Sequence, residues 1–251
     1  MKVFILCGGY GTRLDHEGKN KPKALIKIGK EPIIIHIIKI FIKYKYTEFV
    51  LCMGYKRHLI ENFFFQKYNV LVVEKKKDLK LVNLTINKVN IKIYFVNTGL
   101  HTGTGGRIKI ANNLLKNKSD FFMTYCDGLA KINLNSLYKS FKKSKKLVTL
   151  TAVRPQHRYG VIKIKNNLVL SFNNNNPKQD IWVNGGFFLI KTKALKVIRN
   201  KNMFWEQEPL RKLIKEKELS CFRLNNFWAS LDTQKDKINL NNLWKQKKSY
   251  W

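Results

Sequence analysis

A short apolar run near the start of the chain leads directly into glycines, and this feature constrains the fold more than any other. Val3 to Leu6 is followed by Cys7-Gly8-Gly9-Tyr10-Gly11-Thr12-Arg13. A short apolar run that ends at glycine is typical of a buried strand. Glycines after a strand let backbone N–H groups approach a phosphate, and an arginine adds a bidentate charged donor. The sequence therefore predicts an anion-binding loop after the first strand of an α/β domain.

This loop differs from the two commonest nucleotide-binding motifs. It lacks the third glycine of a dinucleotide fingerprint, and no Gly-Lys-Ser/Thr follows it as in a Walker loop. Lys21-Pro22-Lys23 comes next, and because proline fixes the backbone it can hold a lysine toward the loop. The alternative is that both lysines are ordinary surface residues.

Later segments predict a mostly parallel sheet flanked by helices. Glu31-Pro32 opens a helix over 33–44, with proline in its first turn. Apolar runs that alternate with helix-like segments predict strands at 49–53, 70–73, 91–96, 121–125 and 148–153. The expected class is an α/β fold with a Rossmann-like, mixed, mostly parallel sheet.

The pattern changes after Tyr159. Val161 to Ile164 and Leu168 to Phe172 flank Asn166-Asn167, a two-residue turn signal that predicts an antiparallel hairpin. A strand over 182–190 contains Asn184-Gly185-Gly186, where the glycines indicate a bulge or a close approach to a ligand. A helix is expected over 205–217. We therefore predict a β-rich insertion in the C-terminal half.

The composition favours one cytosolic domain. A chain of 251 residues, 44% of them hydrophobic, can bury roughly three quarters of its unfolded surface in a single core. No apolar run reaches membrane-spanning length, and the apolar start is too short for a signal peptide. The four cysteines lack metal-binding, redox or disulfide spacing: Cys7, Cys52, Cys126 and Cys221. We expect reduced thiols in the cytoplasm.

The net charge of +33 suggests an anionic partner such as nucleic acid or a membrane surface. Only eight of the 49 basic residues are arginine, however, and the lysine clusters at 75–77 and 142–146 lack interleaved aromatic residues. A solvated lysine-rich surface is the favoured interpretation, without a nucleic-acid or membrane partner. A basic nucleic-acid-binding protein is the alternative outside enzymes.

Two aspartates are candidate metal ligands. The predicted strand 121–125 ends in Cys126-Asp127-Gly128, and open α/β sheets bind ligands at the carboxyl ends of their strands. Asp232 follows the apolar pair Phe227-Trp228 and can supply a second carboxylate to a Mg²⁺ site that keeps waters and substrate phosphates. Taken singly, each aspartate is more often a helix cap. A covalent intermediate is not expected, because no nucleophile elbow or Cys–His arrangement is visible.

The glycine loop and the lysines together resemble a known family. Gly8 to Leu14 followed by Lys21-Pro22-Lys23 is similar to the signature of the sugar-phosphate nucleotidylyltransferases, whose substrates are a nucleoside triphosphate and a sugar-1-phosphate. Further segments resemble the glucose-1-phosphate cytidylyltransferase branch, and the resemblance spans the whole chain: Thr104-Gly105-Gly106-Arg107, Asn184 to Phe188, Trp205 to Leu210 and Leu243-Trp244.

This resemblance implies an activity. It implies transfer of CMP from CTP to α-D-glucose 1-phosphate by Mg²⁺-assisted in-line attack, giving CDP-glucose and pyrophosphate for cell-surface polysaccharides such as O-antigen. The same chemistry with another nucleotide or sugar-1-phosphate is the alternative. The resemblance also implies homo-oligomers. It further implies a single domain 1–251 with a nucleotide-binding half (1–155) and a sugar-binding and C-terminal half (156–251).

The resemblance also assigns roles to residues. Arg13 and Lys23 would be catalytic, Asp127 and Asp232 would bind Mg²⁺, and Asn184 and Gly185 would bind the sugar. The nucleotide and its phosphates would contact Leu6, Gly8, Gly9, Tyr10, Gly11, Thr12, Arg13, Lys23, Thr102, Arg107 and Cys126.

The chain departs from the family pattern at two places. Asn173 to Asn176 stands where the family has a Glu-Lys pair that contacts the sugar and its phosphate, and Cys126 replaces a glycine. Asparagine can still form hydrogen bonds with sugar hydroxyls, but the positive charge of the lysine that contacts the phosphate is lost.

Overall fold

The computed structural model describes residues 1–10, 21–154, 161–166, 168–173 and 181–251, and of residues 161–165, 169 and 171–173 it describes only the backbone. Its helices are α2 (Ile33–Ile42), α3 (Arg57–Lys67), α4 (Thr104–Leu114), α5 (Leu134–Ser144), α6 (Glu208–Lys215) and α7 (Gln234–Lys245), with 3₁₀ turns at Lys23–Leu25 and Thr192–Val197. Its strands are β1 (Val3–Cys7), β2 (Lys27–Ile28), β3 (Glu31–Pro32), β4 (Glu48–Met53), β5 (Leu71–Lys76), β6 (Leu79–Ile86), β7 (Val89–Asn97), β8 (Phe121–Tyr125), β9 (Gly128–Ala130), β10 (Val148–Val153), β11 (Val161–Lys165), β12 (Leu168–Asn173), β13 (Val183–Ile190), β14 (Leu219–Leu224) and β15 (Trp228–Ser230).

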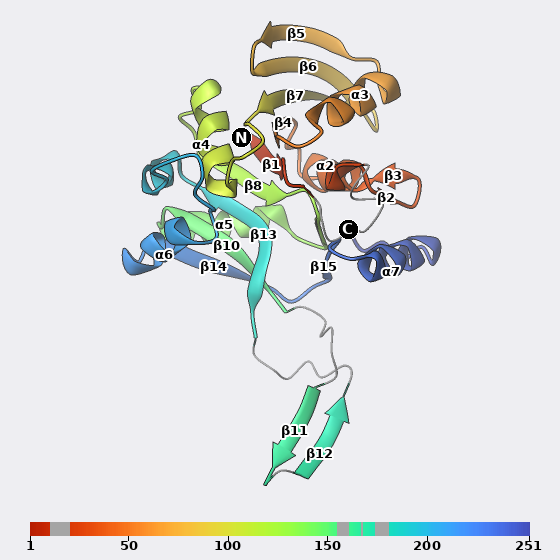
Figure 1. Ribbon diagram of the computed structural model, residues 1–251, viewed down its shortest axis with the longest axis vertical. Coiled ribbons are helices and arrows are strands. Elements are labelled where there is room, and N and C mark those ends of the chain that lie inside the picture. The colour runs from red at the N-terminus through yellow and green to blue at the C-terminus, as the bar shows by residue number, and fades with distance from the viewer. Residues whose placement is uncertain (11–20, 155–160, 167, 174–180) are drawn as a thin grey trace.

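A nine-stranded mixed sheet carries the fold, in the order β14-β10-β13-β8-β1-β4-β7-β6-β5 (Figure 1). The central strands β8, β1, β4 and β7 are parallel, and so are β10 and β14. Strand β13 runs antiparallel to both of its neighbours, and β5, β6 and β7 form an antiparallel meander. The predicted α/β class with a mixed, helix-flanked sheet is confirmed.

Two segments correct the prediction. Residues 79–86 lie in a stretch expected to be helical, but they form β6, because Val82, Leu84 and Ile86 are buried at every second position. Strand β13 was assigned to the insertion, yet it lies inside the main sheet between β8 and β10. Its residues 185–190 are all buried, as a strand covered on both faces requires.

The predicted hairpin is confirmed in β11 and β12, which pair with each other. In Figure 1 this hairpin lies apart from the nine-stranded sheet. Two helix starts differ from the prediction. Pro32 is the N-cap of α2 rather than part of its first turn, and α6 begins at Glu208 rather than at Trp205.

Helices cover both faces of the sheet, so the first strand is buried throughout. Val3, Ile5 and Cys7 of β1 face a core shared with α2, α5 and α7, while Phe4 and Leu6 face a second core shared with α4 and α6. Side chains alternate between the faces of a strand, which explains why a fully covered strand is apolar at every position.

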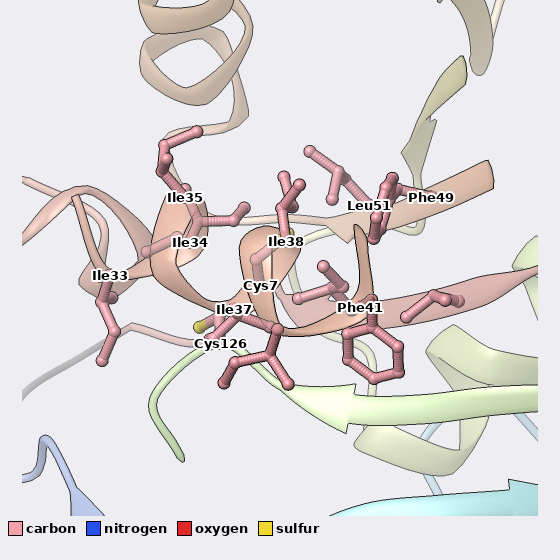
Figure 2. Close-up of a cluster of buried hydrophobic side chains, with 14 of the residues drawn as sticks. Cys7, Ile33, Ile34, Ile35, Ile37, Ile38, Phe41, Phe49, Leu51 and Cys126 are labelled. Atoms are coloured by element: carbon pink, nitrogen blue, oxygen red, sulfur yellow. The ribbon is translucent and has the colours of Figure 1, made fainter. Parts of the chain in front are cut away.

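Helix α2 is buried almost all round. Eight of its ten residues are buried, and Figure 2 shows its isoleucines packed with Phe49 and Leu51 of β4. Its His36 bonds through both ring nitrogens: Nε2 lies 2.9 Å from the Ile28 carbonyl oxygen, and Nδ1 accepts the indole N–H of Trp251 at 3.1 Å. Because indole only donates, Nδ1 is unprotonated and Nε2–H donates to Ile28. This histidine therefore joins the last residue of the chain to an early helix.

No helix within the described ranges is long and apolar enough to cross a membrane.

Candidate active site

A cavity of about 650 Å³ lies at the carboxyl ends of β1 and β8. Four segments and Lys23 line it: residues 6–10, residues 100–104 with Arg107, residues 125–127, and Asn202 with Phe204. Nine residues that the sequence predicted for binding or catalysis therefore meet here: Leu6, Gly8, Gly9, Tyr10, Lys23, Thr102, Arg107, Cys126 and Asp127. This is the sheet edge at which α/β folds bind ligands.

Lys23 joins the two predicted metal ligands. Its Nζ donates to Asp127 Oδ2 at 2.7 Å and to Asp232 Oδ1 at 2.8 Å. Pro22, with φ of −63°, caps the 3₁₀ turn that aims Lys23 inward, whereas Lys21 is exposed. Burial opposes the charge of Lys23, but the attraction of Asp127 and the hydrogen bonds to both carboxylates outweigh it. Together they raise the pKa of Lys23 above its ordinary value, so the ammonium is charged at neutral pH.

A short strand pair brings the two aspartates together. Strands β9 and β15 are antiparallel, with Gly128 opposite Ser230, and the ladder continues as Leu231 N–H donates to the Asp127 carbonyl at 2.8 Å. The helix-capping role is taken by Thr233 at the start of α7, in a capping box with Asp236. The Asp232 carboxylate can therefore bind Lys23 instead of capping the helix.

This donor set fits a magnesium ion. Asp127 and Asp232 are partly exposed, and Mg²⁺ in proteins is held by one or two carboxylates together with waters and substrate phosphates. No group of three or more His, Cys, Asp or Glu side chains suited to a metal occurs in the described part of the chain. An all-protein metal cage is therefore not present among these residues, whereas a site completed by phosphate oxygens is possible.

Arg107 is a buried residue that lines the cavity. It is 4% exposed, and its guanidinium donates to oxygens at 2.7–3.3 Å. These are the carbonyl oxygens of Gly8, Met53, Gly99 and Leu100 and the hydroxyl of Thr98. Burial lowers its pKa from the ordinary value. Arg107 thus fixes the ends of β1 and β4 to the start of the loop after β7, and direct contact with a phosphate stays a prediction.

The two described glycines of the loop differ in their surroundings. A Cβ on Gly8 would lie 2.3 Å from Arg107 Nη1, whereas a Cβ on Gly9 would meet none of the described residues within 4 Å. Gly8 therefore leaves space for Arg107, and Gly9 borders open space in the cavity. Gly11, Thr12 and Arg13 lie outside the described residues, as do Asn174 to Asn176.

The predicted sugar-binding residues lie beside the cavity. Asn184 Nδ2 donates to Tyr125 Oη at 3.4 Å, and the Gly185 carbonyl accepts the indole N–H of Trp228 at 2.8 Å. The predicted bulge is confirmed by a register shift where β10 pairs with this part of β13. Gly186 has a φ of +83°, and a Cβ on it would lie 2.8 Å from the ring of Tyr125.

The thiols beside the cavity are packed and neutral. Burial raises the pKa of Cys126 to about 12, with the charge of Asp127 adding to the effect. Figure 2 shows Cys7 and Cys126 among the isoleucines of α2. A role for either thiol as a nucleophile is not supported.

Sequence reasoning missed several cavity residues: Leu100, His101, Asn202, Phe204 and Tyr125. Tyr125 could have been found, because it ends the strand that precedes Asp127. Phe204 lies directly before Trp205 to Leu210, a segment that carried the family resemblance without a role. Leu100 and His101 directly precede Thr102, a predicted binding residue, whereas Asn202 reaches the cavity through tertiary packing alone.

The chain is similar to known proteins over its full length. A model of the nucleotidyl transferase family matches residues 2–245. The chain belongs to this family. A glucose-1-phosphate cytidylyltransferase of Salmonella typhimurium is 34% identical over 255 residues, which cover 100% of this chain and 98% of that protein. A probable glucose-1-phosphate cytidylyltransferase of Bacillus subtilis is also 34% identical, over 100% of this chain and 99% of its own length.

Solved structures agree with this family fold. HddC from Yersinia pseudotuberculosis, complexed with GMP-PN, has a TM-score of 0.71 at 19% identity, with 97% of this chain and 99% of that chain covered. A UDP-glucose pyrophosphorylase complexed with UDP-glucose has a TM-score of 0.70 at 14% identity, with 98% of each chain covered. The chain is thus a nucleotidyltransferase by sequence family and by fold.

Proposed function

We propose that this nucleotidyltransferase transfers CMP from CTP to α-D-glucose 1-phosphate, giving CDP-glucose and pyrophosphate. The proposal is carried by Lys23, which lines the cavity together with Asp127 and the glycine loop and donates hydrogen bonds to Asp127 and Asp232. The choice of cytosine and glucose is supported by the full-length similarity to glucose-1-phosphate cytidylyltransferases.

The proposed reaction is one in-line displacement. A phosphate oxygen of glucose 1-phosphate attacks the α-phosphorus of CTP, a P–O bond forms, and the bond from the α-phosphorus to the bridging oxygen breaks as pyrophosphate leaves. The attacking oxygen is already anionic, so no general base is needed. Catalysis by the protein is then positioning and charge stabilisation.

Lys23 is the residue best placed for this work. Its ammonium is fixed by two carboxylates and stays charged, so it can bind the reacting phosphate without reorganising. Arg13 would bind the departing phosphates, and backbone N–H groups of the glycine loop would orient them.

A divalent cation is part of the proposal. One ammonium and two carboxylates leave the cluster with a net charge of −1, which repels a triphosphate. Mg²⁺ held by Asp127 and Asp232 would reverse this charge and act as a Lewis acid on the phosphates.

The proposal extends to sugar binding, assembly and location. Asn184 and Gly185 would bind the glucosyl group from the side of Tyr125. A single domain over 1–251 is part of the proposal, and the sheet that β13 and β14 share with β1 and β8 supports it. Homo-oligomers are supported by the hairpin, where Leu168 and Leu170 are exposed. A cytoplasmic location agrees with the four free cysteines.

The test is pyrophosphate release with Mg²⁺ and glucose 1-phosphate, using CTP, UTP, GTP and ATP in parallel. The expected result is fastest release with CTP, and little release without the sugar phosphate. Faster pyrophosphate release with another nucleotide would show that CTP is not the preferred substrate. No pyrophosphate release with any of the four would refute the activity.

The charge of +33 supports nucleic-acid binding as a second candidate. That function predicts affinity that falls steeply with salt and does not depend on Asp127 or Asp232. A mobility-shift titration of wild type and Asp127→Asn at two salt concentrations distinguishes the two candidates.

A further inference from the structure

Residues 201–206, here called the strap, pack closely across the first turn of α4. Gly103 N–H donates to the Lys201 carbonyl at 2.9 Å, and Gly106 N–H donates to the Met203 carbonyl at 3.2 Å. A Cβ on Gly103 or Gly106 would lie 2.3 Å or 2.0 Å from a strap carbonyl oxygen. These glycines therefore allow the strap to approach the helix, which explains why the segment after Thr102 contains them.

Glu206 fastens the strap to two walls of the cavity. Its Oε2 accepts the hydroxyl of Thr104 at 2.6 Å, and its Oε1 accepts the hydroxyl of Tyr125. Thr104 begins α4 and Tyr125 ends β8, so one carboxylate joins two elements that line the cavity. A carboxylate oxygen only accepts hydrogen bonds, so the hydroxyl groups of Thr104 and Tyr125 are the donors.

Two consecutive aromatic residues of the strap lie on opposite sides, with Phe204 at the cavity and Trp205 in the core. Trp205 is fully buried and packs against Phe188, with its backbone N–H donating to Thr104 Oγ1 at 2.8 Å. Phe204 lines the cavity and is 50% exposed. Tyr10 and Leu100, which also line the cavity, are 42% and 43% exposed.

This exposed apolar lining needs a ligand with an apolar face. Lys23 provides a positive charge for phosphates, but phosphates do not cover an aromatic ring. Every nucleobase has a π-face that stacks on aromatic side chains. The part of a nucleotide that suits Phe204 is therefore its nucleoside.

We infer that Phe204 contacts the nucleoside of the nucleotide substrate, and that Glu206 is the positioning residue that holds Phe204 in place. The inference rests on the proposed function only in requiring a nucleotide substrate, because stacking does not depend on which base is bound.

The test measures equilibrium binding of each nucleoside triphosphate to the full chain, followed by steady-state kinetics with the one that binds best. Phe204→Ala should weaken nucleotide binding about 10-fold, the scale of one lost base–aromatic stack. The KM for the sugar phosphate should stay unchanged, and Phe204→Tyr should bind like wild type. The matched control is Phe65→Ala, since Phe65 is also partly exposed but lies on α3 outside the cavity.

Glu206→Ala should also weaken nucleotide binding, while Glu208→Ala, which removes an exposed ion pair with Arg199 at the start of α6, should not. If Glu206 acts through Phe204, the losses of the two variants should not add. The nucleotide affinity of the Phe204→Ala, Glu206→Ala double variant should then lie within a factor of about 2 of the weaker single variant. A purely structural Glu206 would instead give additive losses and a lower melting temperature.

Unchanged binding in Phe204→Ala, or a loss confined to the sugar phosphate, would overturn the inference. Preference of the wild type for a base other than cytosine would contradict the proposed function alone. Binding of no nucleotide at all would contradict both.

Discussion

Lys23 and Lys21 are separated by one proline, yet their surroundings differ completely. Lys23 is held between two carboxylates and Lys21 is exposed. Lys23→Ala should lower kcat/KM by about 10²-fold or more, the scale of one lost transition-state donor. Lys21→Ala should change kcat/KM little. Equal losses in the two variants, measured by pyrophosphate release, would show that Lys23 has no special role.

The carboxylates can be tested in the same assay. Asp127→Asn keeps the size of the side chain but removes a charge from the proposed Mg²⁺ site, so turnover should be abolished while a cooperative melting transition shows that the fold is intact. Asp120→Asn is the control, because Asp120 pairs with Lys142 on the surface, away from the cavity. A folded Asp127→Asn variant with near wild-type activity would rule out this metal ligand.

Residue roles were predictable from sequence only where local chemistry decides them. The glycine loop, Lys23 and Asp127 follow strands or a proline, so their common edge of the sheet could be inferred. The contacts of Arg107 could not, because they require Gly8, Met53 and Gly99 to converge from three separate segments.

Among the structural elements, the loop after β1 contains two glycines whose substitution should affect stability to different extents. In Gly8→Ala the new methyl group would displace Arg107 and break its bonds to backbone carbonyls, so stability should fall by about 1–3 kcal/mol. The methyl group of Gly9→Ala would meet no neighbour among the described residues, so stability should change by less than about 0.5 kcal/mol. Thermal melting of the two variants decides this, and a Gly9→Ala variant less stable than Gly8→Ala would contradict the packing described.

Strands and helices were predictable where their apolar pattern is unambiguous. The short runs at β1, β4 and β8 and the Asn166-Asn167 hairpin turn are such cases. Strand β6 was missed because the adjacent apolar residues Leu81 and Val82 interrupt its alternation of apolar and polar residues. The place of β13 in the sheet depends on pairing with β8 and β10, which no local pattern reveals.

At the scale of the whole molecule, His36 makes the docking of the C-terminal Trp251 sensitive to pH. Burial lowers the pKa of His36, only partly opposed by its hydrogen bond to Ile28. Nearby Glu31 raises this pKa and Lys39 lowers it, and these two residues are themselves paired. Protonation of Nδ1 would remove the acceptor for the Trp251 indole.

The direction in which stability changes with pH follows from the pKa of His36 in the unfolded and in the folded chain. An unfolded histidine titrates near 6.5, and the folded value lies below it, so between them the unfolded chain binds more protons. Stability contributed by neutral His36 should be complete above about pH 6.5 and decline as the pH falls below it. Melting temperatures measured between pH 7.5 and 5 should show this decline, and His36→Gln should reduce its slope. An equal slope in both proteins would exclude His36 as the titrating group.

We propose that this chain makes a nucleotide sugar at the cavity lined by Lys23 and Asp127, where Lys23 also binds Asp232. The most direct measurement is ³¹P NMR of a mixture of the protein, CTP, glucose 1-phosphate and Mg²⁺. CDP-glucose and pyrophosphate should appear in equal amounts with wild type and be absent with Asp127→Asn. No CDP-glucose with wild type, or the same yield with Asp127→Asn, would contradict the proposal.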